Sequence, residues 1–288
     1  MGLRINQNIA AFNAYRNLSV TDSQMAKSLE KLSSGFRINR AADDASGLAI
    51  SEGLRSQIGG LKVAVRNAQD GISVVQTAEG ALNESQAILQ RMRDLAVQAA
   101  NGGSQDATAQ AAADTEYQQL NNELDRIANT TKFGSQTLLS GSYNGTFQVD
   151  SSTATGSTIG VDLTAATGAL SGLTITGLDS TGLGTGGGAT DLTSTTNATT
   201  AIGVLDSALQ DVSTVRAKLG AYQNRFEHTI NNINVAVENL SASESRIRDT
   251  DMASEMVNFT RSQILSQAGT AMLAQANQQP QSVLKLLQ

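Results

Sequence analysis

The longest pattern in the chain is a set of apolar positions that recur every three or four residues between residues 44 and 100. This spacing places the set on one side of an α-helix. The positions are Leu54, Ile58, Leu61, Val65, Ala68, Ile72, Val75, Ala78, Leu82, Leu89, Met92, Ala96 and Ala99. At 1.5 Å per residue this helix would be roughly 85 Å long, longer than a compact domain of this mass is wide. The pattern therefore predicts a rod or a polymer.

Two shorter helices flank this stretch. Helical spacing over residues 3–36 is followed by an irregular link over residues 37–40. After the long helix, Asn101-Gly102-Gly103-Ser104 predicts a turn, and a second amphipathic helix follows and ends near residues 129–134. Because the turn is short, the helices on either side of it should be antiparallel neighbours.

Helical spacing returns near the C-terminus. It predicts a second long helix over residues 202–247, with a break near residues 241–243 or 249–251. A last helix carries Met252, and its apolar residues extend to more than one side. Pro280 either ends that helix or begins its final turn.

The segment over residues 138–200 has a different character, because Gly, Ser and Thr dominate it. Three short β-branched runs predict strands in hairpins, at residues 146–149, 158–163 and 173–176. Residues 181–200 are expected to form a flexible loop.

The two ends of the chain expose more apolar side chains than either could cover alone. This excess favours contacts with helices of other copies. The predicted assembly residues are Ile5, Ile9, Phe12, Met256, Phe259, Ile264, Leu284, Leu286 and Leu287.

The sequence therefore predicts a mainly α fold, in which long antiparallel helices form a coiled-coil-like rod with a small β-hairpin region in the middle of the chain. Residues 1–42 and 249–288 form a terminal helical pair. Residues 43–140 and 200–248 form a long-helix bundle. Residues 141–199 hold short hairpins and a solvent-facing loop, with no large extra domain.

Composition excludes several function classes. The chain has 288 residues, no Cys, one His and a formal net charge of −6. No basic patch stands out, which argues against nucleic acid as a partner. No run of 18 apolar residues exists, so no membrane span is expected. The first residues lack a basic region followed by an apolar run, so no cleaved Sec signal peptide is expected.

The sequence predicts no enzyme, no cofactor and no metal site. His228 is the single His and is expected in a packed helix, with no G-x-S-x-G or H-E-x-x-H motif. The Asp-rich central segment lacks the spacing of an EF-hand. Asp43 and Asp44 precede the long helix, where negative charge favours a capping role over acid–base chemistry.

Five stretches resemble bacterial flagellins. Residues 32–50 read LSSGFRINRAADDASGLAI, residues 66–73 read RNAQDGIS, and residues 77–82 read TAEGAL. Residues 245–255 read SRIRDTDMASE, and residues 283–288 read VLKLLQ. Together the resemblance covers roughly residues 1–140 and 200–288.

The resemblance implies a subunit that self-assembles into the helical flagellar filament used for swimming, an extracellular structure. It implies that the terminal helices form an inner tube and the long helices an outer tube. It also implies unfolded export by the flagellar type III apparatus with a chaperone, and contacts with the filament cap and the hook-junction proteins.

The far end of the long helix carries a second stripe. The main seam is the apolar set described above, which here consists of Leu89, Met92, Ala96 and Ala99. The second stripe lies about 100° round the helix from it and consists of Ile88, Arg91 and Leu95. An antiparallel neighbour would bring Glu116 within reach of Arg91 or Arg93. The stripe is either a packed edge with a surface ion pair or a contact for the next subunit. The resemblance implies that Arg91, Leu95 and Glu116 contact other subunits and, on free monomers, the vertebrate receptor called Toll-like receptor five.

Two alternatives compete with a filament subunit. A hook–filament junction protein shares the N-terminal pattern, but the C-terminal match favours flagellin. A cytosolic coiled-coil binding module would form an oligomer of fixed size, whereas a flagellin forms an open-ended polymer.

Overall fold

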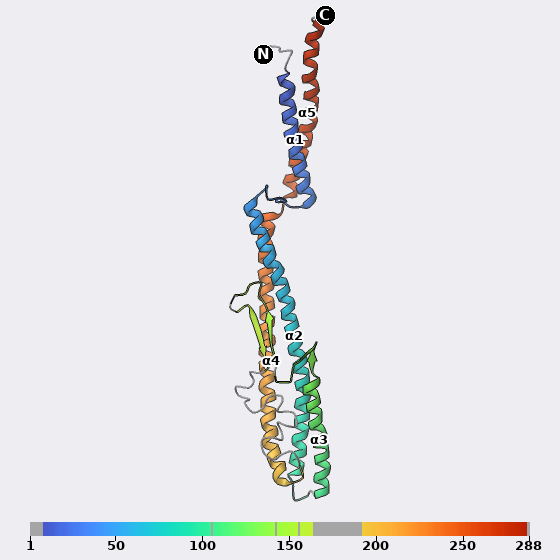
Figure 1. Cartoon of the computed structure of the whole chain (residues 1–288), viewed down its shortest axis with the longest axis vertical. Coiled ribbons are helices and arrows are strands. Elements are labelled where there is room, and N and C mark those ends of the chain that lie inside the picture. Colours follow the sequence, from blue (N-terminus) through green and yellow to red (C-terminus); the bar gives the residue numbers. More distant parts are fainter. Residues whose placement is uncertain (1–7, 105, 142, 155, 164–191, 287–288) are drawn as a thin grey trace. The chain divides into compact units, whose positions relative to one another are not determined.

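The computed structural model describes residues 8–104, 106–141, 143–154, 156–163 and 192–286, with side chains in the last helix described as far as residue 278 (Figure 1). The fold is mainly α, as predicted. Its helices are α1 (Ile9–Ser34), α2 (Ala45–Ala99), α3 (Ala107–Thr130), α4 (Thr195–Arg248) and α5 (Met252–Leu286). Its strands are β1 (Lys132–Phe133), β2 (Gln136–Thr137), β3 (Asn144–Gln148) and β4 (Thr158–Asp162).

The chain forms two compact units. The terminal unit combines residues 1–58 with residues 238–288, and the central unit spans residues 59–237. The boundaries therefore fall inside α2 and α4, rather than at the helix ends as in the predicted three-part division. That division stays a prediction.

The central unit has one continuous hydrophobic core. It is built from α2, α3, the β3–β4 hairpin and α4. Most of the predicted seam of α2 is buried, with Leu82 1% exposed and Leu89 and Met92 fully covered, whereas Val65 and Ile72 are half-buried. Arg93 pairs with Asp206 at 2.6 Å, and Arg216 contacts Gln86 and Glu79, so polar contacts join α2 to α4 at the margins of this core.

One close approach fixes how α2 meets α4. The ring of Phe226 is 0% exposed and packs edge-on against Phe147, with ring centroids 5.6 Å apart. It also lies against Gly71 of α2, where an added Cβ would come within 2.6 Å of the ring. Glycine is therefore required at this position by the space that the ring occupies.

The observed strands agree in part with those predicted from the sequence. β3 and β4 pair in antiparallel register, with Phe147 opposite Ile159, which confirms the two predicted strands near residues 146–149 and 158–163. The short β1–β2 pair was not predicted, because each strand has only two residues. The predicted strand at residues 173–176 lies outside the described residues.

The predicted loop over residues 181–200 extends too far, because α4 begins at Thr195 rather than at residue 202. Ser194 accepts a hydrogen bond from the backbone N–H of Thr196 through its hydroxyl and one from Ala198 through its carbonyl. A serine in this position caps a helix. The buried residues Leu192, Ala198 and Ala201 supply the tertiary contacts that outweigh the weak helix propensity of the Thr residues.

Pro280 does not end α5, which continues to Leu286. Proline lacks the N–H that would bond the carbonyl four residues earlier, which belongs to Ala276. In this structure that carbonyl accepts a hydrogen bond of 2.7 Å from the side-chain amide of Asn8. The Asn8 side-chain oxygen also caps α1 by accepting from the N–H of Ala11. Asn8 thus stabilises both terminal helices at once.

Replacing Asn8 should separate these two roles. Asn8→Ala removes both contacts and should weaken the pairing of α1 with α5 by about 1–3 kcal/mol. Asn8→Asp keeps the capping oxygen but loses the donor to Ala276. Hydrogen exchange should then show the first turn of α1 protected in Asn8→Asp and exposed in Asn8→Ala, with α5 near Ala276 deprotected in both. If both variants lose the same protection at the first turn of α1 and at α5 near Ala276, Asn8 does not have two separable roles.

Candidate assembly surfaces

The described part of the terminal unit has almost no core of its own. Among its described hydrophobic side chains only Ile38 and Ile58 are buried. Its other buried side chains are the polar residues Ser28, Ser51 and Ser262. A unit this poor in buried apolar surface gains little stability by itself.

The contact between α1 and α5 combines small and polar residues with half-buried apolar ones such as Leu18 and Phe259. The helices lie side by side (Figure 1). Gly269 allows Leu18 to approach, since an added Cβ there would lie 3.3 Å from its side chain. The hydroxyl of Ser266 donates to the Asp22 carboxylate at 3.0 Å. Such contacts fix the register of the pair, and many large apolar side chains remain on the outside.

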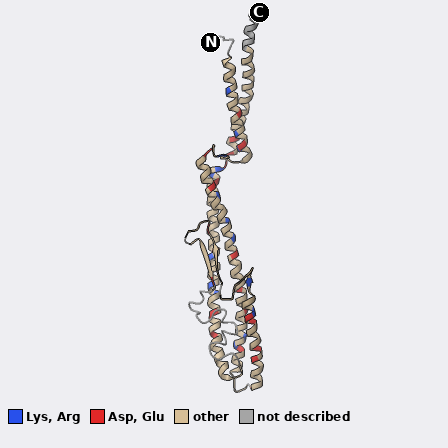
Figure 2. Cartoon of the chain, viewed as in Figure 1, with Lys and Arg blue, Asp and Glu red and all other residues tan. Residues whose placement is uncertain are grey.

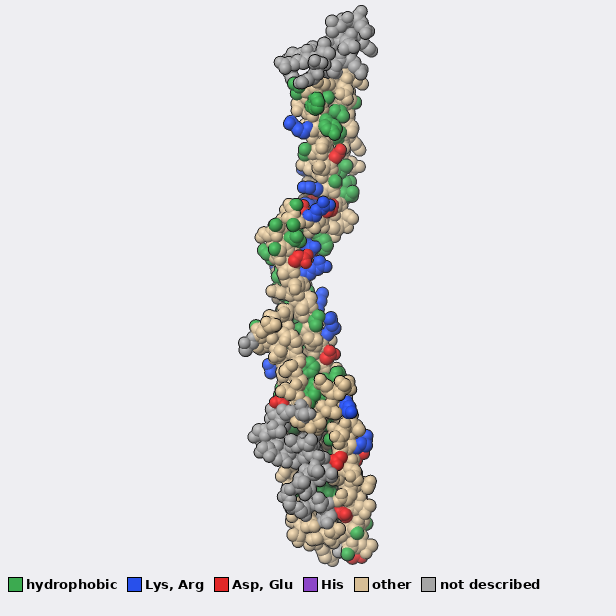
Figure 3. Space-filling view, in the orientation of Figure 1, with side chains coloured by type: hydrophobic (Ala, Val, Ile, Leu, Met, Phe, Trp, Pro, Cys, Tyr) green, Lys and Arg blue, Asp and Glu red, His purple; other side chains and the backbone are tan. Residues whose placement is uncertain are grey.

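The outward faces of α1 and α5 carry what we call the terminal apolar surface. Figure 3 shows hydrophobic side chains gathered along this helix pair. Phe12 is 72% exposed and Ile264 is 60% exposed. The members are Ile9, Phe12, Tyr15, Val20, Leu29, Met252, Met256, Val257, Ile264, Leu265 and Met272. An exposed apolar set of this size marks an interaction site.

On α5 the surface is broad. At about 100° per residue, Met252, Val257 and Leu265 span about 220° of the helix circumference. Figure 2 shows few charges on this helix, and Glu255 and Arg261 are the only charged residues in the part with described side chains. Around Arg261, side chains including Met256 and Ile264 line a shallow hollow. Since α1 covers only the remaining side, several neighbouring helices could contact α5 at once.

Most predicted assembly residues can be placed. Ile9, Phe12, Met256 and Ile264 belong to the terminal apolar surface, and Phe259 is half-buried. Ile5 and Leu287 lie outside the described residues. Leu284 and Leu286 lie in α5, but their side chains are outside the described part.

Seven members of this surface were not among the predicted assembly residues. They are Tyr15, Val20, Leu29, Met252, Val257, Leu265 and Met272. Tyr15 follows Phe12 by three residues, so helical spacing could have identified it.

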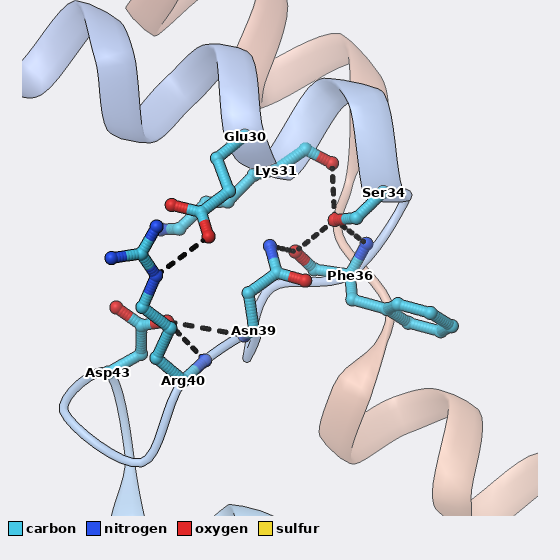
Figure 4. Close-up of polar contacts among 7 residues, drawn as sticks. All are labelled: Glu30, Lys31, Ser34, Phe36, Asn39, Arg40 and Asp43. Carbon is cyan, nitrogen blue, oxygen red and sulfur yellow. Dashed lines mark hydrogen bonds and ion pairs between the residues drawn. The ribbon is translucent and has the colours of Figure 1, made fainter.

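A compact link joins α1 to α2 (Figure 4). Gly35 ends α1 with a φ of 75°, a left-handed conformation that favours glycine. Arg40 pairs with Glu30 at 2.9 Å. The Asp43 carboxylate accepts hydrogen bonds from the N–H groups of Asn39 and Arg40, which hold the pKa of Asp43 below its usual range. Asp43 therefore stabilises the link rather than the helix.

Asp44, by contrast, has the predicted capping role. Its side chain accepts a hydrogen bond of 2.8 Å from the N–H of Gly47 in the first turn of α2.

The link also contacts the junction between α4 and α5. The Arg37 N–H donates to the Arg248 carbonyl at 2.7 Å, and the Thr250 N–H donates to the Gly35 carbonyl at 3.0 Å. The Arg248 guanidinium pairs with Glu52 at 2.7 Å and lies 4.8 Å from the centre of the Phe36 ring. The predicted break near residues 249–251 is thus confirmed, and these contacts position both terminal helices.

The second stripe of α2 has an exposed part and a buried part. Arg91 pairs with Glu116 of α3 at 2.7 Å, which confirms the predicted proximity, and both side chains are exposed. Leu95 is only 3% exposed and belongs to the core of the central unit. Ile88 packs against the same core. The apolar part of the stripe is therefore buried within the chain, and only the ion pair faces outward.

The structure offers little for catalysis or metal binding. His228 lies on α4, as predicted, but is exposed rather than packed. Within the described ranges no three His, Cys, Asp or Glu residues group closely enough to hold a metal ion. No helix among the described residues is both long enough and apolar enough to cross a membrane.

The chain is similar to known proteins over nearly its whole length. The profile of the bacterial flagellin N-terminal helical region matches residues 5–144, and that of the C-terminal helical region matches residues 202–287. The flagellin of Halalkalibacterium halodurans is 52% identical and covers 98% of this chain and 99% of its own. The flagellin of Bacillus subtilis is 48% identical, and the match covers 99% of this chain and 100% of that flagellin.

The chain is also similar to a third flagellin and to a solved structure. Flagellin FlaB2 of Treponema pallidum is 48% identical, with 98% of this chain and 99% of its own covered. Among solved structures, the crystal structure of Bacillus cereus flagellin is 36% identical over 58% of this chain and 88% of that one, with a TM-score of 0.48. A junction protein and a cytosolic coiled-coil module are not favoured by these relatives. The chain belongs to the bacterial flagellins and is a structural subunit of the flagellar filament, not an enzyme.

Proposed function

We propose that the terminal apolar surface is the main contact between copies in the filament. The observation that carries this proposal is the contrast between Ile38 and Ile58, the buried hydrophobic residues of the terminal unit, and the exposed apolar set on α1 and α5. Burying such side chains against other copies contributes about 1.5–3 kcal/mol for each large residue that becomes fully covered. Leu284, Leu286, Leu287 and Ile5 belong to the proposal on the sequence pattern alone.

The test compares two valines of nearly equal exposure. Val257 on α5 is 59% exposed, and Val235 on α4 is 57% exposed and lies outside the terminal apolar surface. Val257→Asn should raise the critical concentration for polymerisation about tenfold or more, since 1.4 kcal/mol corresponds to a factor of ten. Val235→Asn should leave it within about twofold. The proposal fails if the two variants polymerise equally well.

The remaining partners rest on the resemblance. We propose that the chain leaves the cell through the flagellar type III apparatus with a chaperone. It then adds to an extracellular filament that contacts cap and hook-junction proteins. The division into an inner-tube part, residues 1–42 and 249–288, and an outer-tube part, residues 43–140 and 200–248, belongs to the same proposal.

A second proposal concerns the ion pair between α2 and α3. We propose that Arg91 and Glu116 contact the next subunit and, on free monomers, Toll-like receptor five. Their exposure and mutual distance of 2.7 Å support an outward-facing role. Leu95 would act through the fold that holds them, because it is buried.

A further inference from the structure

Three methionines lie on the terminal apolar surface. Met252 is 47% exposed, Met256 is 50% exposed and Met272 is 63% exposed. In contrast, Met92 is 0% exposed in the core of the central unit. The same chain therefore presents both accessible and inaccessible thioethers.

The composition makes these thioethers the principal oxidisable groups. The chain contains no Cys and no Trp. A peroxide that reaches the free subunit therefore meets methionine sulfur as its most reactive target, and reaction depends on whether the sulfur is accessible. Exposure thus selects Met252, Met256 and Met272 over Met92.

We propose that Met252, Met256 and Met272 form an oxidation site that determines whether a free subunit can join the filament. This inference rests on the proposed role of the terminal apolar surface. The oxidant is a peroxide such as hydrogen peroxide. A sulfur lone pair attacks one peroxide oxygen, the O–O bond breaks and an S–O bond forms. The other oxygen leaves as water with both hydrogens, so sulfur is oxidised by two electrons and the peroxide is reduced.

The product opposes assembly for a physical reason. The sulfoxide is polar and chiral, whereas the thioether is apolar and flexible. Assembly would bury the new S–O dipole among apolar side chains such as Val257 and Ile264, and a polar group buried without a hydrogen-bond partner is unfavourable. An oxidised subunit is thereby kept out of the growing polymer, while subunits already assembled have these sulfurs covered.

The experiment treats full-length monomer and preformed filaments with the same dose of hydrogen peroxide. Peptide mass spectrometry follows each methionine, and seeded polymerisation gives the critical concentration. In the monomer, the three surface methionines should oxidise at least tenfold faster than Met92. The critical concentration should rise at least tenfold, and methionine sulfoxide reductases with dithiothreitol should restore it. Surface methionines that oxidise no faster than Met92, or oxidised monomer that polymerises normally, would overturn the inference.

Matched variants identify the responsible sulfurs. The triple variant Met252→Leu, Met256→Leu, Met272→Leu keeps the volume and apolarity of the surface, so it should polymerise before and after peroxide. Met92→Leu should remain as sensitive as the unaltered chain. Loss of assembly by the peroxide-treated triple variant would contradict the assignment.

The filament arm tests the underlying proposal separately. The three methionines should oxidise at least tenfold more slowly in filaments than in monomers. Equal rates in both would contradict the role of this surface as the subunit contact, whatever the selectivity in the monomer.

Discussion

Gly71→Ala is expected to lower the free energy of unfolding of the central unit by about 1–3 kcal/mol, although alanine normally stabilises a helix. The added Cβ would lie 2.6 Å from Cζ and 2.9 Å from Cε1 of Phe226. That ring cannot withdraw into free space, because it is fully buried and held edge-on by Phe147. The steric cost therefore exceeds the gain of about 1 kcal/mol in helix propensity.

The matched control lies on the same helix. An added Cβ at Gly80 meets no atom within 4 Å. Gly80→Ala should therefore raise the free energy of unfolding by about 1 kcal/mol. Denaturant unfolding followed by circular dichroism should show opposite shifts of the midpoint for the two variants.

A rescue variant tests the cause. Phe226→Leu should be destabilising by itself, but adding Gly71→Ala to it should cost much less than in the unaltered chain, because the ring is gone. A double-mutant cycle measures this coupling. If the two changes are additive, the contact between Gly71 and the Phe226 ring does not determine the cost.

Most helices of the central unit could be predicted because their apolar sides pack against each other within one chain. The seam of α2 repeats at helical spacing from Leu54 to Ala99, so most of the long helix from Ala45 to Ala99 follows directly from the pattern. The start of α4 could not be found in this way. Its first turns consist of Thr and Asn, and contacts made by Ala198 and Ala201 stabilise them.

The continuation of α5 depends on a contact distant in sequence. Pro280 is a local stop signal, and Asn8, 268 residues away from Ala276, supplies the hydrogen bond that offsets it. The residues around Pro280 do not by themselves indicate such a partner.

The candidate assembly surface was predictable only in part. Ile9 and Phe12 could be predicted because the helix that carries them has more apolar side chains than it can bury by itself. The contact side of the helix pair includes small residues such as Ser262 and Gly269 beside the half-buried Phe259. A count of hydrophobic positions does not detect such a contact, so it could not show which side of α5 faces outward.

The second stripe of α2 shows why a single seam is an incomplete description. The core that contains α2 also includes α3 and α4, so α2 has two buried directions. Leu95, about 100° from its neighbours in the main seam, therefore fills the core instead of an external contact. The sequence alone left both possibilities open.

Leu95→Ala is accordingly expected to destabilise the central unit by about 2–5 kcal/mol, through lost burial and the cavity that remains. Arg91→Ala removes only an exposed ion pair with Glu116, so its cost to stability should be about 0–1 kcal/mol. The two variants therefore separate stability from contact, and thermal unfolding measures the first.

The second measurement is functional and uses folded protein at a temperature below both transitions. If Arg91 contacts the next subunit and the receptor, Arg91→Ala should raise the critical concentration and weaken Toll-like receptor five signalling by free monomer, with the melting temperature nearly unchanged. Leu95→Ala should affect both activities only as far as it populates unfolded chains. The opposite outcome is that fully folded Leu95→Ala loses signalling while Arg91→Ala signals normally. That result would place the receptor contact at Leu95 and would require its side chain to leave the core on binding.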